Sequence, residues 1–369
     1  MNIYPFQAIF PKEDLITSAD SFFKSMKYQF TEYQKSGFFD KSPQEALYLY
    51  QITQNGTKNL GLVAATDIED FISNKVLKHE KTLAAKEQNM MQLILRRNAL
   101  IKPVLLAYKS NKIVIETLKN TIVRKKPILR IKFENDKTEH KIWKISDADT
   151  VESIKKLFKQ KIPKAYIADG HHRSSTSVIL YESTNIKNAK NKFGKLLTIY
   201  FPIHDLEIWD YNRVVEVFNT VDLPVFLAKL SKYCKIKTLK KGRKPKTKFV
   251  MTMYIKNYWF SLTWKKKVLK KYAQQKILLD SELFNTYIMA EILGVQDVRE
   301  SKKITYFSGK EGLDELEEEV HKHEDKVAFF IYPVLADELI QIADQKKTLP
   351  PKSTWFEPRI KNGIIAKEF

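Results

Sequence analysis

Apolar and polar positions recur along the chain with two different periods, and the change of period predicts where strands give way to helices. Alternating or continuous apolar runs predict strands at 4–11, 101–109 and 164–170, and hairpins at 46–66, 123–145 and 249–264. Asn55-Gly56 and Asn135-Asp136 occupy the turns of the first two hairpins. Helical spacing predicts helices at 17–37, 67–76, 86–98, 147–161 and 171–182.

The second half of the chain continues with the same mixture. The predicted elements are a strand, a turn and a helix start at 194–215, a helix at 278–294, strands at 304–309 and 327–333, and helices at 314–320 and 336–345. Hairpins combined with strand–helix units are typical of an α+β or mixed α/β fold and argue against an all-parallel sheet. The lysine-rich loop at 240–248 is the expected boundary between domains at 1–240 and 241–369.

Composition narrows the class of protein. The 369 residues are enough for one large domain or for two to three ordinary ones. The single cysteine, Cys234, excludes an internal disulfide framework. No run approaches the roughly 18 apolar residues of a membrane span, and residues 1–14 lack the features of a signal peptide. We therefore expect a soluble cytoplasmic protein without a membrane partner.

The formal net charge of +21 raises the question of nucleic acid binding. The positive charge is almost entirely lysine, with only nine arginines, whereas base reading and bidentate phosphate contacts favour arginine. The basic runs at 240–248 and 265–271 lie between or beside strand-like segments, which is typical of solvated loops and edges. The composition therefore argues against a nucleic acid partner.

The stretch YIADGHHRSSTSVIL, residues 166–180, concentrates reactive side chains between two apolar runs. It predicts a buried strand, a turn at Gly170 and a helix, because glycine adopts tight turns that a side chain would obstruct. The first turn of a helix has backbone N–H groups without intrahelical partners, and these attract anions. Arg173 would add a bidentate phosphate contact, while His171 and His172 would supply donors or proton carriers.

Asp169 and three hydroxyl residues complete this stretch. A carboxylate at this place is suited to binding a metal ion, capping the helix or acting as a base, and Ser174, Ser175 and Thr176 supply hydroxyls. One alternative is that Asp169 is a plain N-cap that His171 orients. Another is a zinc site, which lacks support because the chain has one cysteine and no His-x3-His spacing. A phosphate-binding turn is the preferred interpretation.

Two further segments carry reactive side chains. In KHEKTLAAK, residues 78–86, His79 and Glu80 precede a helix, and the pair is either a general base with its neighbour or a solvated helix entrance. In LPPKSTWFEPRIKNG, residues 349–363, Lys352–Thr354 follow two prolines. This segment is either a rigid loop that presents cations and hydroxyls or a C-terminal segment held by its aromatic residues.

Together these segments resemble a known family. Tyr4-Pro5-Phe6, the HEKT segment at 79–82, DGHHR after its strand and PPKST-x-F-x-P-R…G occur in the order typical of the bacterial and archaeal family called domain of unknown function 1015. The resemblance covers Pro5–Gly363. DGHHR is also similar to the turn that cradles nucleotide phosphates in a broader superfamily, which contains ParB, sulfiredoxin and the free serine kinases.

The resemblance implies a ParB/sulfiredoxin-like nucleotide-binding core with an additional mixed α/β C-terminal portion. It implies a phosphate site at Asp169–Ser174, in which Gly170, His171, Arg173 and Ser174 bind the nucleotide. Sulfiredoxin chemistry needs a cysteine where this chain has His171, and ParB-like DNA binding needs a helix-turn-helix that the sequence does not show. A kinase or a nucleotide-binding regulator remains.

The resulting prediction is a phosphotransferase that uses ATP or ADP with Mg²⁺ to phosphorylate a small hydroxyl substrate such as free serine. The phosphates would rest on the Gly170 turn and Arg173, and Asp169 would bind the Mg²⁺. The alternatives are a non-catalytic nucleotide-sensing regulator and a DNA-binding ParB-like protein.

The predicted pocket combines three distant segments. Glu80, with Glu13 as the alternative, would take the proton of the acceptor hydroxyl, and His172 would assist in catalysis. Lys352, Ser353 and Thr354 would contact the phosphates. His79–Thr82 and the loop at 352–354 are therefore expected to lie close to the Gly170 turn.

Overall fold

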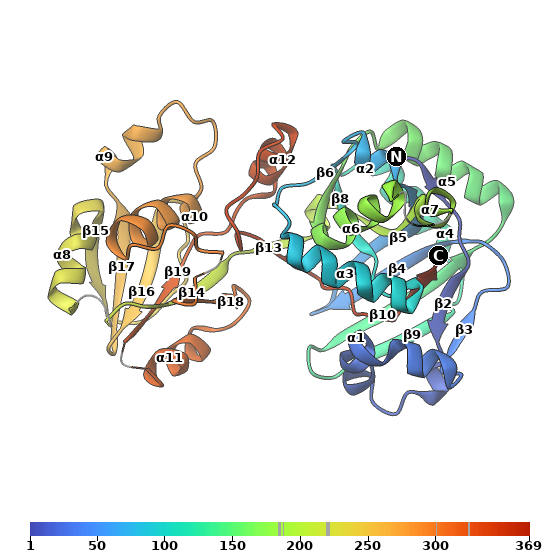
Figure 1. The fold of residues 1–369 in the computed structure, drawn as a ribbon, viewed down its shortest axis with the longest axis horizontal. Helices are drawn as coiled ribbons and strands as arrows, with labels where there is room; N and C mark the ends of the chain where they lie inside the picture. Colours follow the sequence, from blue (N-terminus) through green and yellow to red (C-terminus); the bar gives the residue numbers. More distant parts are fainter. Residues whose placement is uncertain (184–185, 187, 219–221, 300, 324) are drawn as a thin grey trace. The chain divides into compact units, whose positions relative to one another are not determined.

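The computed structural model describes residues 1–183, 186, 188–218, 222–299, 301–323 and 325–369. They form two compact units (Figure 1). The first unit comprises Met1–Glu207 together with Pro358–Phe369, and the second comprises Ile208–Glu357. The second unit is thus an insertion into the first. The loop at 240–248, expected to mark the domain boundary, lies within the second unit.

A nine-stranded mixed sheet forms the centre of the first unit. Its order is β6-β11-β8-β12-β5-β4-β10-β9, with β1 paired to β5. β11 runs parallel to β6 and β12 runs parallel to β8, whereas the other pairs are antiparallel. The strands are β1 (Ile3–Tyr4), β4 (Leu47–Gln54), β5 (Thr57–Asp67), β6 (Val76–Leu77), β8 (Val104–Tyr108), β9 (Leu129–Phe133), β10 (Thr138–Ile145), β11 (Ala165–Asp169) and β12 (Lys195–Pro202).

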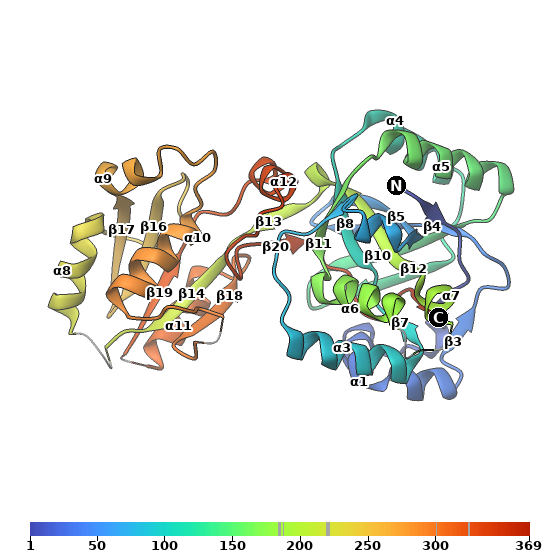
Figure 2. The same ribbon diagram turned by 45° about the horizontal axis from the view of Figure 1, so that its top comes forward.

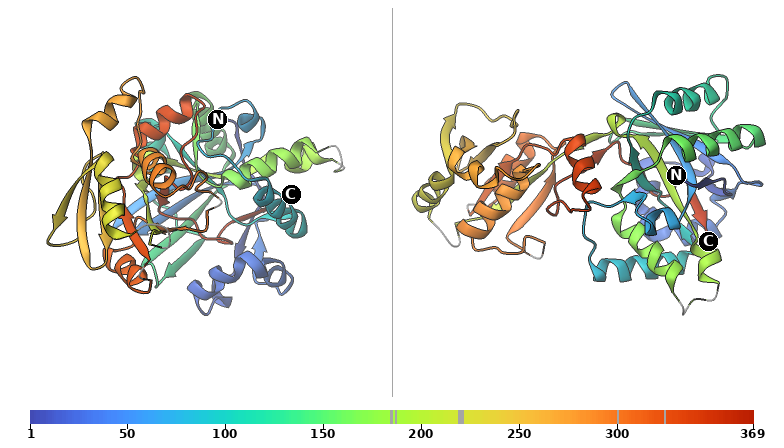
Figure 3. Two further views of the ribbon diagram at one scale, coloured as in Figure 1. Left: turned by 60° about the vertical axis from the view of Figure 1, so that its left-hand side comes forward. Right: turned by 90° about the horizontal axis from the view of Figure 1, so that it is seen from above.

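Helices lie on both faces of this sheet. α4 and α5 cover one face, and α3, α6 and α7 lie on the other (Figures 2 and 3). β8 is buried at every residue, and its sequence VLLAY accordingly shows no alternation. The helices are α1 (Ala19–Lys35), α2 (Glu69–Ile72), α3 (Ala84–Arg97), α4 (Lys112–Ile122), α5 (Ala148–Lys161), α6 (His171–Glu182) and α7 (Ala189–Phe193), with 3₁₀ turns η1 (Glu13–Leu15) and η2 (Ile203–Asp205).

Local sequence signals set several of these elements. Asn55 and Gly56 have positive φ angles of 49° and 80°, the conformation of a type I′ turn, and join β4 to β5 as predicted. Asp147 caps α5 by accepting a 2.9 Å hydrogen bond from the backbone N–H of Thr150. No prediction covered α4, because its β-branched residues favour a strand in isolation.

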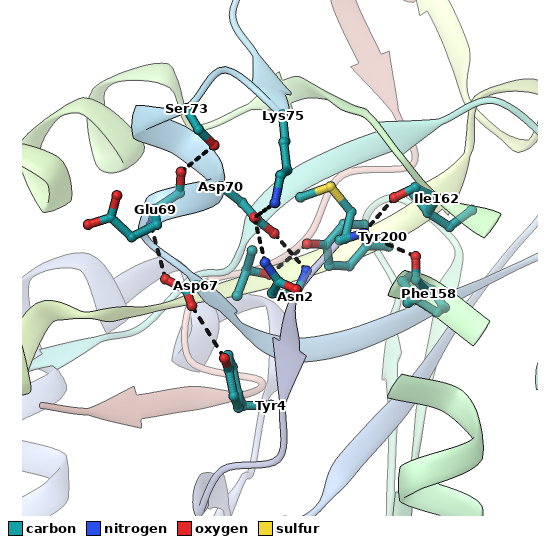
Figure 4. A network of polar contacts seen from close by, with 12 residues as sticks. Asn2, Tyr4, Asp67, Glu69, Asp70, Ser73, Lys75, Phe158, Ile162 and Tyr200 are labelled. Carbon is teal, nitrogen blue, oxygen red and sulfur yellow. Dashed lines mark hydrogen bonds and ion pairs between the residues drawn. The ribbon is translucent and has the colours of Figure 1, made fainter. Parts of the chain in front are cut away.

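The N-terminal residues of the first unit are held by buried polar contacts (Figure 4). The backbone N–H and the side-chain amide of Asn2 donate to the two carboxylate oxygens of Asp70, at 2.6 and 2.9 Å. Lys75 forms an ion pair with the same carboxylate at 3.0 Å. Asp70 is fully buried, so these partners provide the compensation that a buried charge requires.

A second, smaller sheet joins distant parts of the first unit. Its order is β3-β2-β21-β7, formed by β3 (Phe39–Lys41), β2 (Ala8–Pro11), β21 (Ala366–Glu368) and β7 (Ala99–Leu100). Since β21 lies between β2 and β7, the chain's last residues complete a sheet that its first residues begin.

The second unit is built on a six-stranded sheet in the order β15-β17-β16-β19-β14-β18, and neighbouring strands in this order are antiparallel. Alternate residues enter two cores: Val215 packs with α8 and η4, and Val214 packs with α11. The elements are β14 (Tyr211–Glu216), β15 (Cys234–Leu239), β16 (Val250–Ile255), β17 (Tyr258–Trp264), β18 (Ile304–Ser308), β19 (Lys326–Phe330), α8 (Leu223–Tyr233), α9 (Lys266–Leu269), η3 (Lys270–Tyr272), α10 (Asp280–Leu283), the π-helix η4 (Phe284–Ile292), α11 (Leu313–His321) and α12 (Ala336–Asp344). β13 (Glu207–Trp209) pairs separately with β20 (Trp355–Glu357).

The structure corrects one predicted element. Residues 211–216 form strand β14 and not the start of a helix. Val214 and Val215 face different cores, which is the period of a strand. The mixed α/β class itself is confirmed. Within the described ranges, no helix combines the length and the apolar character needed to cross a membrane.

Candidate functional site

The predicted turn follows strand β11 directly. β11 ends at Asp169, Gly170 has φ 108° and ψ 27°, and α6 begins at His171, which confirms the predicted strand, turn and helix. Gly170 carries no side-chain cap, and Asp169 is not the N-cap. The backbone N–H of Ser174 makes the first intrahelical hydrogen bond, to the carbonyl of Gly170. The N–H groups of the preceding turn therefore lack intrahelical acceptors.

The sheet topology explains which residues surround this turn. β8 is antiparallel to β11, so the residues that precede β8 lie beside the end of β11. Lys102 is one of them. β6 is parallel to β11, so their C-terminal ends lie side by side. The segment that follows β6, residues 78–83, therefore begins next to the end of β11. The backbone N–H of Gly363 donates to the carbonyl of Ile101 and brings the C-terminal segment to the same place.

Asp169 is paired with two cations. Its Oδ2 lies 2.8 Å from the ammonium of Lys102 and 3.2 Å from the guanidinium of Arg173, which also donates to the carbonyl of Pro103. Burial alone would raise the pKa of Asp169, but Lys102 and Arg173 outweigh burial and hold the pKa well below its usual range. A Cβ at Gly170 would lie 2.7 Å from the Arg173 guanidinium, so only glycine lets Arg173 fold back over the turn.

The two histidines dock the segment 78–83 onto α6. Nε2 of His172 accepts a 3.3 Å hydrogen bond from the backbone N–H of Leu83, and Nε2 of His171 accepts a longer one, 3.5 Å, from the N–H of His79. An imidazole nitrogen accepts a hydrogen bond only when it is unprotonated. This arrangement brings Glu80 beside α6, as the sequence predicted for residues 79–82.

His79, Glu80 and His171 form a compact group. The rings of His79 and His171 meet edge to face with centroids 4.5 Å apart, and Nδ1 of His171 lies 3.6 Å from Oε2 of Glu80. Burial lowers the pKa of His79 to about 3. Burial, and then the neighbouring His79, hold the pKa of His171 well below its usual value. Both rings are therefore neutral at physiological pH, and Glu80 and His171 are not an ion pair.

The hydroxyl residues of α6 face the interior of the first unit. The hydroxyl of Ser174 donates to the carbonyl of His171, so both of its donors are used within the helix. Ser175 donates to the carboxylate of Glu87 on α3. Hydrogen bonds from Ser175 and then Thr82 lower the pKa of Glu87. These contacts pack α3 against α6, and the role of Ser174 in binding a nucleotide stays a prediction.

Lys352, Ser353 and Thr354 belong to the second unit. The carbonyl of Lys352 accepts a 3.3 Å hydrogen bond from Arg213, and the hydroxyl of Ser353 donates to the carbonyl of Pro350 at 2.7 Å. Ser353 and Thr354 are buried. The expected pocket that joins this loop to the Gly170 turn stays a prediction.

The comparisons with known proteins agree with the sequence motifs. The family model described as "Protein of unknown function (DUF1015)" matches residues 6–291. The chain belongs to this family. No curated protein matches the chain. Solved structures similar to this family member include a free serine kinase in complex with AMP, at 12% identity and TM-score 0.39, covering 82% of this chain and 92% of that one.

Two further solved structures have comparable similarity. A free serine kinase variant in complex with ADP has 13% identity and a TM-score of 0.38, covering 82% of this chain and 92% of that one. SbnI with a C-terminal truncation, from Staphylococcus aureus, has 11% identity and a TM-score of 0.41, covering 81% and 85%.

Sequence reasoning missed three charged residues around the turn of this DUF1015 member. Lys102 lies in the strand predicted at 101–109. The antiparallel pairing of β8 with β11 brings its ammonium group to the carboxylate of Asp169. Arg359 acts electrostatically on both Asp169 and Lys102. Glu87 lies inside the predicted helix at 86–98. A prediction of the strand order would have found Lys102; the other two depend on tertiary packing.

Proposed function

We propose that the chain binds ATP or ADP at the N-terminus of α6 and transfers a phosphoryl group to a small hydroxyl compound such as free serine. The observation that carries the proposal is an excess of positive charge. Lys102, Arg173 and Arg359 all act on the single carboxylate of Asp169, and the helix N-terminus adds its own positive potential. Such a site favours a polyanion such as a nucleotide's phosphates.

The reaction would use few protein groups. The acceptor oxygen attacks the terminal phosphorus, the bond from this phosphorus to its bridging oxygen breaks, and Glu80 takes the acceptor's proton. The Glu80 side chain is 32% exposed and lies beside α6. His172 accepts from the N–H of Leu83 through Nε2, so in this proposal it holds the segment of Glu80 in place. Positioning and charge stabilisation supply most of the catalysis in such transfers.

Mg²⁺ would arrive with the nucleotide. Oδ2 of Asp169 is engaged by Lys102 and Arg173, so in our proposal Asp169 binds the magnesium ion through Oδ1. The same pairing holds Asp169 ionised and weakens it as a base. For this reason we assign proton transfer to Glu80, and we keep a nucleotide-sensing regulator as the second candidate.

The test is a ³¹P NMR assay with ATP or ADP, Mg²⁺ and a panel of hydroxyl acceptors that includes serine. We expect phosphoserine formation by the unaltered chain, its loss in Glu80→Gln, and its retention in Glu87→Gln, a matched carboxylate on α3. Nucleotide binding by calorimetry should survive in Glu80→Gln. Tight nucleotide binding without turnover of any acceptor would make the protein a sensor. DNA affinity with a steep salt dependence would favour the DNA-binding interpretation.

A further inference from the structure

We propose that His79, Glu80 and His171 form a binding site for a divalent transition-metal ion, with Zn²⁺ as the probe. The three residues come from two segments about 90 positions apart, and each offers one ligand atom within 4.8 Å of the others. Two imidazoles and one carboxylate are a donor set that zinc and similar ions bind with a coordination position left open. The proposal does not depend on phosphoryl transfer.

The distances suit an ion of this kind. With metal–ligand bonds of about 2.1 Å, two ligand atoms of a tetrahedral site lie about 3.4 Å apart. Nδ1 of His171 and Oε2 of Glu80 are 3.6 Å apart, which is close to this separation and too long for a hydrogen bond. The rings of His79 and His171 meet edge to face with centroids 4.5 Å apart, so the two imidazoles are direct neighbours. All three ligand atoms lie within 4.8 Å of one another, so no pair must close by more than about 1.4 Å to reach this separation.

Burial shapes the site from one side. His79 is fully buried and His171 is 6% exposed, whereas the Glu80 side chain is 32% exposed. The two imidazole rings therefore form the buried side of the proposed site. Glu80 forms the side that is open to solvent, through which an ion enters and a further ligand reaches it. Binding through Nδ1 of His171 puts the proton on Nε2 and costs the long hydrogen bond from the His79 N–H.

Glu80 now has two proposed roles, metal ligand and general base, and one carboxylate oxygen cannot perform both at the same time. As a metal ligand, Glu80 is required for binding of the ion in the absence of nucleotide. As a base, it is required for phosphoryl transfer by zinc-free protein supplied with Mg²⁺. Mg²⁺ prefers oxygen ligands, so it should compete poorly for a site with two imidazoles.

The experiment uses the full chain without a polyhistidine tag, stripped of metal and titrated with Zn²⁺ alone against a chromophoric chelator. We expect one ion per chain and at least about tenfold weaker binding in Glu80→Gln and in His171→Asn. Binding should be unchanged in Glu87→Gln and in His204→Asn, which changes an exposed histidine of η2. Millimolar Mg²⁺ should not displace the ion. Co²⁺ substituted for Zn²⁺ should give visible absorption that Glu80→Gln alters.

Two results would overturn the proposal: no stoichiometric binding by the unaltered chain, or equal affinity in the unaltered chain and Glu80→Gln. Glu80 is partly exposed, so this variant should fold, and circular dichroism checks that it does. Failure of the kinase assay with intact Zn²⁺ binding would refute the proposed function alone. Turnover without Zn²⁺ binding would refute the metal site alone.

Discussion

Two aspartate–arginine pairs, one in each unit, have nearly the same spacing and opposite environments. Asp169 and Arg173 are four residues apart, and their side chains are 32% and 14% exposed. Asp210 and Arg213 are three residues apart and 4% and 1% exposed. Lys102 and Arg173 hold the pKa of Asp169 well below its usual range, whereas burial raises the pKa of Asp210 to about 7 against the effect of Arg213.

The partners of the two arginines explain the difference. Arg213 donates to Asp210 and to the carbonyls of Tyr211 and Lys352, and its guanidinium lies over the ring of Phe284 at 5.2 Å. Arg213 therefore connects strand β14 to the loop at 352–354 within the second unit. Arg173 lies over a glycine turn at the start of a helix, beside two further cations. A pair of residues in the sequence therefore does not reveal its role; burial and surrounding charge do.

Removing the buried arginine should have the largest effect. Arg213→Ala leaves Asp210 buried without its cation and frees the Lys352 carbonyl, so we expect a loss of roughly 3–5 kcal/mol in the stability of the second unit. Hydrogen-exchange mass spectrometry of peptides from β14 and β19 measures it. Arg173→Ala is the matched control and should leave those peptides unchanged. Equal protection in both variants would contradict the structural role of Arg213.

The second unit should also lose stability as the pH rises. Burial raises the pKa of Asp280 to about 7, so the folded state binds its proton more tightly than the unfolded state does. The free energy that protonated Asp280 contributes to folding is present at low pH and is lost as the pH rises through about 7. We expect exchange protection of this unit to fall by roughly 2–4 kcal/mol between pH 5 and pH 8.

Asp280→Asn should reduce this pH dependence to the part that Asp210, whose pKa burial also raises to about 7, contributes. Asparagine keeps an oxygen that can accept the 2.8 Å hydrogen bond from the backbone N–H of Phe249. The variant should also lower the pKa of Asp210, because the charge of Asp280 raises it. A variant as pH-sensitive as the unaltered chain would show that other groups control the effect.

The less buried pair, Asp169 and Arg173, should affect ligand binding and not folding. Arg173→Ala should weaken calorimetric binding of ATP or ADP with Mg²⁺ by ~1.5–3 kcal/mol, the scale of a hydrogen bond to a charged group. Arg173→Lys keeps the charge but not the bidentate geometry, and should recover part of the loss. Unchanged nucleotide affinity in Arg173→Ala would remove Arg173 from the proposed phosphate site.

The smallest effect concerns the docked segment. His172→Ala leaves the backbone N–H of Leu83 without its imidazole acceptor, so we expect a local loss of roughly 0.5–1.5 kcal/mol in exchange protection at residue 83. Peptides from β4 should keep their protection. A global change would mean that His172 supports the whole unit and not only the segment.

Local signals in the sequence predicted local structure well. Asn55-Gly56 predicted the hairpin, and Gly170 predicted the turn. Asparagine and glycine adopt the positive φ angles that these turns require. β14 was misread because the valines of a strand buried on both faces show no alternation. Its burial comes from α8, the next helix along the chain, and from α11, which lies about 100 residues further on.

The site was only partly predictable for the same reason. The segment 79–82 was expected near the turn, but the sequence has neither the His-x3-His spacing nor the cysteines that indicate a zinc site. The structure assembles His79, Glu80 and His171 through the parallel pairing of β6 with β11. Two short strands of two and five residues decide this pairing, and nothing in either sequence specifies its partner.

The place of β21 has a consequence for the order in which the protein folds on the ribosome. Residues 366–368 pair with β2 and β7, but the whole second unit, Ile208–Glu357, is synthesised before them. At typical translation rates of about 5–20 residues per second, this takes about 8–30 s. During that time the inserted unit is still being completed, and β2 and β7 lack the strand that pairs with both of them. The nascent first unit therefore exposes two strand edges to chaperones and to other chains until residues 366–368 have been synthesised.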